Sequence, residues 1–233
     1  MPQYLIDFEW QRDKKGYRLL DPERPAAPKK DIHPIFRFPM EETILSAHWG
    51  KARRIVRCGG QLESYRPLEQ FDSLFKLFAN AAADPPGLLE FVQKFGPLTT
   101  AGLDKERSEP VDLVLEHAAA MRTFLAHAAG DGSRLVAAIV LNHGGVPLGN
   151  MTVRLTLDPN TRTPRLRLTP RSLLDALWVQ LGQALSGGAA IRQCEHCGQW
   201  FESGVGTGRR ADAKFCSNEH KIAFHSLKRS KEK

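Results

Sequence analysis

The chain has 233 residues, of which 42% are hydrophobic and 25% charged, and this composition is typical of a globular protein rather than a disordered one. No stretch of about eighteen apolar residues occurs, so the sequence predicts no membrane span. The first residues lack the apolar segment of a signal peptide, and we therefore expect a cytoplasmic protein. The formal net charge of +7 favours polyanionic partners such as nucleic acid without establishing them.

Short strands separated by prolines are expected before residue 67. Gly59-Gly60 can supply the positive φ of a tight turn, so the pattern over 53–64 predicts a hairpin. Arg53 and Arg57 share one face of its first strand, where we expect both side chains to be solvated. The other strands expected from apolar composition are 4–8, 16–20 and 35–38.

From residue 67 the apolar positions recur with the period of a helix. A first helix is predicted over 71–82, with one apolar face made of Phe71, Leu74, Phe75 and Phe78. The following stretches predict a helix over 87–95 that ends at Gly96-Pro97, a polar loop over 98–109 and a helix over 110–129.

Strict alternation of apolar and polar residues around Asp158-Pro159-Asn160 predicts a half-buried hairpin over 151–168. We expect its inward side chains to be Met151, Val153, Leu155 and Leu157. Thr169-Pro170 then has the chemistry of a helix start, and Gly187-Gly188 that of a helix stop. The helix between them should bury Leu173, Leu174, Leu177, Leu181 and Leu185.

Three of the four cysteines lie close together near the C-terminal end. Cys194 and Cys197 form a C-x2-C pair followed by Gly198, and Cys216 precedes His220 by three intervening residues. In a reducing compartment such clustering indicates metal binding rather than disulfides. Zinc prefers four tetrahedral nitrogen and sulfur ligands, and a Cys3His set leaves no open position. The spacing therefore predicts one structural zinc ion held by Cys194, Cys197, Cys216 and His220.

Local turn and helix chemistry supports this ligand set. Gly198 allows a tight turn that brings the first two thiolates to one side. Ser217 can cap a helix that starts directly after it, which places His220 in the first helical turn. His196 would point away from the ion, and His225 lies more than one turn further along the helix. His220 is therefore favoured, while the other two histidines stay open as alternatives.

The segments IRQCEHCGQWFESG and GRRADAKFCSNEH resemble the C-terminal CGNR-type zinc fingers of bacterial proteins described as stress-induced transcriptional regulators. That family commonly has a cysteine at the position of His220, and the literal Cys-Gly-Asn-Arg string is absent here. The resemblance implies a zinc finger that follows a larger, mostly helical domain. It also implies a role in transcription regulation.

Basic residues surround the predicted zinc site, and clusters of this kind neutralise phosphates. A helix on a metal-held platform can enter a major groove about 12 Å wide. A solvated basic tail is the alternative interpretation. The candidate nucleic-acid contacts are Arg209, Arg210, Lys214, Lys221, Lys228 and Arg229.

Together these patterns predict an α+β protein with two domains. The first, 1–188, is strand-rich over 1–66 and helical over 67–188, apart from the hairpin near 151–168. The second, 189–233, is a treble-clef-like zinc finger with a basic C-terminal helix. No G-x-S-x-G, HExxH or GK[ST] motif occurs, so no enzyme is expected. The predicted function is a zinc-binding transcriptional regulator that binds nucleic acid, and DNA is favoured while RNA stays open. The alternative is a protein-interaction subunit of a larger assembly in which the zinc finger has only a structural role.

Overall fold

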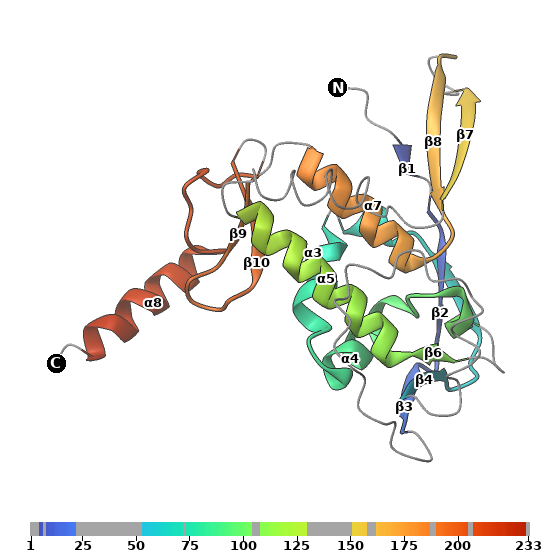
Figure 1. Cartoon of the computed structure of the whole chain (residues 1–233), viewed down its shortest axis with the longest axis horizontal. Helices are drawn as coiled ribbons and strands as arrows, with labels where there is room; N and C mark the ends of the chain where they lie inside the picture. Colours follow the sequence, from blue (N-terminus) through green and yellow to red (C-terminus); the bar gives the residue numbers. More distant parts are fainter. Residues whose placement is uncertain are drawn as a thin grey trace. The chain divides into compact units, whose positions relative to one another are not determined.

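The computed structural model describes residues 5–6, 8–21, 53–71, 73–103, 108–129, 151–157, 162–186, 190–204 and 207–231. The described residues fall into two compact units, one drawn from 1–119 and 147–181 and the other from 120–146 and 182–233. Helices and antiparallel strands occur together, which confirms an α+β protein (Figure 1). The domain boundary after residue 188 stays a prediction.

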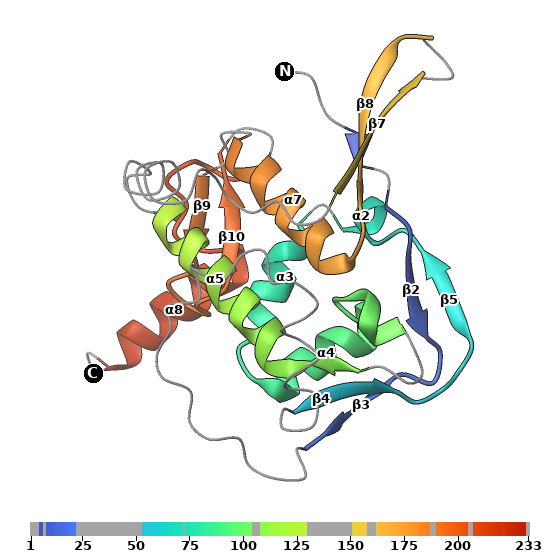
Figure 2. The same cartoon turned by 45° about the vertical axis from the view of Figure 1, so that its right-hand side comes forward.

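In the first unit, the N-terminal strands pair with residues 54–65 in two successive antiparallel ladders (Figure 2). β2 (Trp10–Asp13) pairs with β5 (Leu62–Tyr65), and β3 (Tyr17–Leu20) pairs with β4 (Arg54–Arg57). β6 (Glu109–Pro110) pairs with the other edge of β4. The strand expected at 35–38 lies outside the described residues.

The predicted hairpin over 53–64 is wrong, because β4 and β5 pair with β3 and β2 and not with each other. Gly59 does adopt the expected positive φ of 81°. However, the amides of Gly59 and Gly60 donate to the Asp13 carboxylate at 3.1 and 2.9 Å. These long-range hydrogen bonds hold the glycines beside the β2–β3 turn. The chain therefore continues from β4, which pairs with β3, to β5, which pairs with β2, and does not reverse at the glycines.

Four helices supply most of the buried side chains: α3 (Leu74–Ala81), α4 (Pro85–Phe95), α5 (Val111–Ala129) and α7 (Leu173–Ser186). The predicted apolar face of α3 is confirmed for Leu74, Phe75 and Phe78, which are fully buried. Phe71 lies between α3 and the short α2 (Pro67–Gln70) and contacts Phe95 edge-on at 5.1 Å. None of the described helices is long and apolar enough to cross a membrane.

Polar contacts tie these helices together within the first unit. The Gln180 side chain of α7 accepts from the Phe75 amide at 3.3 Å and donates to the Phe71 carbonyl at 2.9 Å. Trp178 donates from Nε1 to Nδ1 of His117 on α5 at 3.2 Å. Burial lowers the pKa of His117 to about 4, so this histidine is neutral near pH 7 and can accept that hydrogen bond.

The polar loop predicted over 98–109 is wrong in part. Residues Thr100–Leu103 form a 3-10 turn, and Glu109 lies in β6 with its side chain fully buried. The Thr99 amide donates to the Glu109 carboxylate at 2.6 Å. A glutamate is usually exposed, and the polar composition of 98–109 predicts an exposed loop. Glu109 is instead buried and joins the two ends of the segment through its contact with Thr99.

The second predicted hairpin is present as β7 (Met151–Leu157) and β8 (Pro164–Pro170), and β1 (Leu5–Ile6) adds parallel to β8. Most of the face predicted to be inward is exposed: Met151 is half-buried, whereas Val153, Leu155 and Leu157 are 58%, 71% and 68% exposed. The register places them opposite Leu168, Leu166 and Pro164, so the apolar residues do share one face. Among the described residues, no element covers the outer part of this two-stranded ribbon.

The helix start predicted at Thr169-Pro170 is also wrong, because both residues belong to the end of β8. α7 begins at Leu173, and Ser172 provides its N-terminal cap by accepting from the Asp175 amide at 3.1 Å. The predicted core face is confirmed for Leu173, Leu174, Leu177 and Leu181, and Leu185 is half-buried. Gly187-Gly188 lies outside the described residues.

In the second unit, β9 (Ala190–Gln193) and β10 (Trp200–Ser203) form an antiparallel hairpin, and α8 (Asn218–Lys231) is the last described element. Ile191 and Phe201 are buried in the hairpin, and Ser203 donates to the carbonyls of Ala190 and Ala211 at 3.2 and 3.3 Å. These contacts tie the loop before α8 to the hairpin.

Candidate metal centre

A tight turn between β9 and β10 presents the first two cysteines. Cys194 lies directly after β9, and its carbonyl accepts from the Gly198 amide at 2.9 Å. Gly198 has φ of 71°, a left-handed conformation that a side chain would disfavour. The Gln193 side chain donates to the Gly198 carbonyl at 2.8 Å. The turn is therefore held from both sides, with Cys194 buried and Cys197 exposed.

The start of α8 presents the other two residues. Ser217 accepts from the His220 amide at 3.2 Å, which confirms the predicted N-terminal cap of a helix that begins at Asn218. Cys216 immediately precedes the cap, and its carbonyl accepts from the Arg209 guanidinium at 3.1 Å. The cap and the carbonyl contact together fix the backbone positions of Cys216 and His220.

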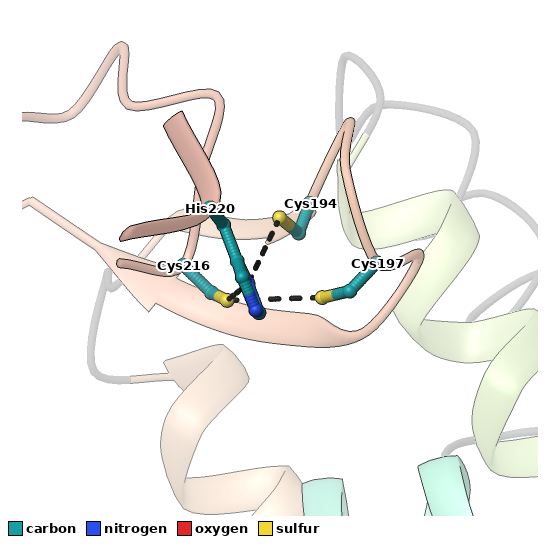
Figure 3. A group of neighbouring side chains, drawn as sticks. All are labelled: Cys194, Cys197, Cys216 and His220. Atoms are coloured by element: carbon teal, nitrogen blue, oxygen red, sulfur yellow. Dashed lines mark hydrogen bonds between the residues drawn. The ribbon is translucent and has the colours of Figure 1, made fainter. Parts of the chain in front are cut away.

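The four side chains converge on one point from the hairpin turn and from the helix start (Figure 3). Their ligand atoms, the three Sγ atoms and one nitrogen of His220, all lie within 4.8 Å of one another. Cys197 Sγ is 3.8 Å from Cys216 Sγ, and His220 Nδ1 is 3.9 Å from Cys194 Sγ and 2.9 Å from Cys216 Sγ. Tetrahedral coordination with bonds of about 2.3 Å separates two sulfurs by about 3.8 Å. The group can hold one metal ion.

The electrostatics of the cluster are also compatible with a bound cation, because thiols this close cannot all ionise unless a cation is present. Burial opposes ionisation of Cys194, but the amides of Cys197, Cys216 and His196 donate to its sulfur and lower its pKa to about 6. Burial raises the pKa of Cys216 to about 12, helped by hydrogen bonding and repulsion from the neighbouring thiols. A divalent cation would reverse that repulsion and favour the thiolate.

The alternative histidines do not join the cluster. His196 sits in the turn with its ring centroid 5.0 Å from that of His220. His225 instead contacts Phe215, at 5.8 Å between ring centroids. Within the described residues, the group able to hold a metal ion is the predicted set of Cys194, Cys197, Cys216 and His220.

Three of the predicted nucleic-acid contacts lie in the loop before α8, and all three are exposed. Arg209 donates to the Cys216 carbonyl and lies over the Phe201 ring at 5.9 Å. Arg210 pairs with Asp212 and Lys214 pairs with Glu195, each at 3.2 Å. Such exposed pairs are weak, but each places a negative charge beside the cation and reduces its attraction for phosphate.

The other three predicted contacts, Lys221, Lys228 and Arg229, are exposed on α8. Arg229 donates to the His225 carbonyl at 3.3 Å. Among the described residues, no acidic side chain forms an ion pair with Lys221 or Lys228. The structure therefore divides the predicted basic set into a partly neutralised loop and a helix whose cations are less compensated.

Sequence patterns missed the residues that hold the loop in place. Arg192 donates to the Ala211 carbonyl at 2.7 Å, and the Glu195 amide donates to the Lys214 carbonyl at 3.0 Å. Neither contact has a sequence signature, since any residue with a suitable donor could make it.

No protein-family model matches the sequence, and no curated protein matches it.

Proposed function

We propose that this protein is a zinc-dependent DNA-binding protein that acts in transcription regulation, and that it is not an enzyme. The observation that carries the proposal is the Cys3His cluster at the first turn of a helix that bears exposed cations. The resemblance to CGNR-type zinc fingers supports the same function.

In this proposal the ion is zinc and its role is structural. Three thiolates and one imidazole are the ligands that zinc prefers, and four protein ligands leave no position for a substrate or an activated water. A β-hairpin turn and a helix start that share one ion make a treble-clef-like finger. The metal would hold α8 against a hairpin whose own buried core is small.

The proposal assigns nucleic-acid binding to α8 first and to the loop second. Lys221, Lys228 and Arg229 project from a helix with a single acidic residue, Glu219, which lies in its first turn. Such a helix is attracted to phosphates, and the attraction weakens as the salt concentration rises.

A salt series tests this function on the full chain. Binding of a fluorescent random duplex is measured by anisotropy for the zinc-loaded protein and for the variant Lys221→Gln/Lys228→Gln/Arg229→Gln. The matched control is Lys14→Gln/Lys15→Gln/Arg18→Gln, which removes three exposed cations from the first unit.

We expect the affinity of the wild-type protein to fall steeply as salt rises. The slope of log affinity against log salt should decrease in magnitude by about 0.9 for each α8 cation that neutralises a phosphate in the wild-type complex. The control variant should keep the wild-type slope. Equal reductions of the slope in both triple variants would contradict the proposal.

A protein-interaction subunit is the second candidate, and the exposed apolar face of β7–β8 favours it. Side chains such as Leu155 and Leu157 rarely gather on one surface without a partner. Zinc would then have only a structural role in the finger. Stable association with a protein partner, together with no affinity for duplexes at any salt concentration, would support this alternative.

A further inference from the structure

The rotation of α8 about its own axis is fixed by its first turn. Ser217 accepts from the His220 amide, and His220 Nδ1 lies 2.9 Å from Cys216 Sγ. With the backbone and the ring both held, His220 defines the inner side of the helix. Ala223 and Phe224 also lie toward this side and are half-buried, and Phe224 packs on Phe215 at 5.2 Å between ring centroids.

The opposite side of α8 forms a distinct surface, which we call the outward face. At 3.6 residues per turn, four residues lie within about 40° of the direction opposite His220. All four are exposed: Asn218, Ile222, His225 and Arg229. Lys221 and Lys228 flank this face along one edge. The outward face thus combines hydrogen-bonding groups, one apolar side chain and a positive margin.

Ile222 is the one apolar residue of the outward face and is 58% exposed. Single exposed apolar residues are ordinary, so its exposure alone carries no argument. The neighbours of Ile222 do carry an argument, because this residue is surrounded by polar side chains that can reach base edges. Leu227 offers a comparison on the same helix: it is 56% exposed but lies about 20° from the direction of His220, on the inner side.

We propose that α8 lies in the major groove of B-form DNA with Ile222 against the 5-methyl group of a thymine, an inference that rests on the proposed function. The thymine methyl is the apolar group that base pairs present in this groove. Asn218 and Arg229 then face neighbouring base edges, while Lys221 and Lys228 face the phosphates of one strand. Helical RNA fits poorly, because its major groove is deep and narrow and uracil lacks the methyl group.

The test begins with selection of preferred duplexes from a random pool by the full, zinc-loaded chain. Each thymine of the selected site is then replaced in turn by deoxyuridine, which removes only the methyl group. Burial of one methyl group is worth a factor of about four in affinity, so one position should show a decrease of about that size. Ile222→Ala should bind the thymine and deoxyuridine duplexes equally. Leu227→Ala should keep the fourfold difference.

The possible failures separate this inference from the proposed function. Absence of duplex binding by the wild-type protein would overturn both. Salt-dependent duplex binding without any thymine-to-deoxyuridine effect would overturn the role of Ile222 and leave the proposed function standing. The same holds if Ile222→Ala keeps the effect, if Leu227→Ala abolishes it, or if RNA helices bind as tightly as DNA. Zinc content, measured for each variant, shows that the finger is intact.

Discussion

Arg57 and Asp13 form an ion pair in the interior of the first unit, with Arg57 Nε 3.0 Å from Asp13 Oδ2. Their side chains are only 5% and 0% exposed. Arg57 also donates to the carbonyls of Leu103 and Gly60. Asp13 in turn accepts from the amides of Lys15, Gly59 and Gly60. The expectation that Arg57 is solvated is therefore wrong: it joins β4 to the β2–β3 turn and to residue 103.

Removal of one partner from this pair should be costly. Arg57→Met leaves the Asp13 carboxylate buried without its cation, and loss of one partner of a buried pair costs about 3–5 kcal/mol. Arg53→Met is the matched control, because Arg53 pairs with Asp21 at 2.7 Å on the surface. We expect the control to change the free energy of unfolding by less than about 1 kcal/mol. Urea denaturation of both variants measures the difference, and similar costs would show that burial of the pair is unimportant.

The buried Glu109 predicts a dependence of stability on pH. Burial raises the pKa of its carboxyl from 4.5 to about 8, although amides of Thr99 and Leu98 donate to it. Between these values the unfolded chain has lost the proton and the folded protein retains it. The free energy of unfolding should therefore fall as pH rises from about 4.5 to 8, by at most about 1.4 kcal/mol per pH unit.

Glu109→Gln removes this dependence because the amide does not titrate. Urea midpoints of the two proteins at pH 5, 7 and 9 make the comparison. The stability of wild type relative to the variant should decline with pH and level off above about 8. A constant difference across the series would mean that Glu109 is ionised in the folded protein throughout.

Loss of a metal ligand should unfold the finger without unfolding the first unit. Cys197→Ser removes one of the four predicted ligands, and structural zinc contributes roughly 10–16 kcal/mol to the folding of small fingers. Cys58→Ser is the control, because Cys58 is an exposed thiol outside the cluster. We expect the Cys197 variant to lose zinc and amide-exchange protection over 190–231, while β2–β5 and α3 keep theirs. Stoichiometric zinc in that variant would refute the ligand set.

Because the apolar face of β7–β8 is exposed, we expect its leucine side chains to tolerate replacement by alanine. Leu155→Ala should change the free energy of unfolding by about 0.5 kcal/mol or less, because this leucine is 71% exposed. Leu177→Ala, at a fully buried leucine of α7, should cost about 2–5 kcal/mol. Thermal or urea denaturation compares the two. A cost above about 2 kcal/mol for Leu155→Ala would show that this face is covered in solution.

The sequence by itself determined the features whose interactions are local. The turn at Gly198 and the cap at Ser217 act within a few residues, so their spacing was enough to place Cys194 near Cys197 and Cys216 near His220. The apolar faces of α3 and α7 followed from periodicity for the same reason, since a helix repeats every 3.6 residues whatever surrounds it.

Only the tertiary structure decided which strand each segment pairs with and which faces are covered. Gly59-Gly60 is competent for a hairpin, but hydrogen bonds to the Asp13 carboxylate, 46 residues away from Gly59, redirect the chain. Likewise, alternation predicted that Leu155 shares a face with Leu157 but not whether anything packs against it. Periodicity states which side chains lie together, whereas burial depends on partners distant in sequence. The outward face of α8 became definable only once His220 had fixed the rotation of that helix.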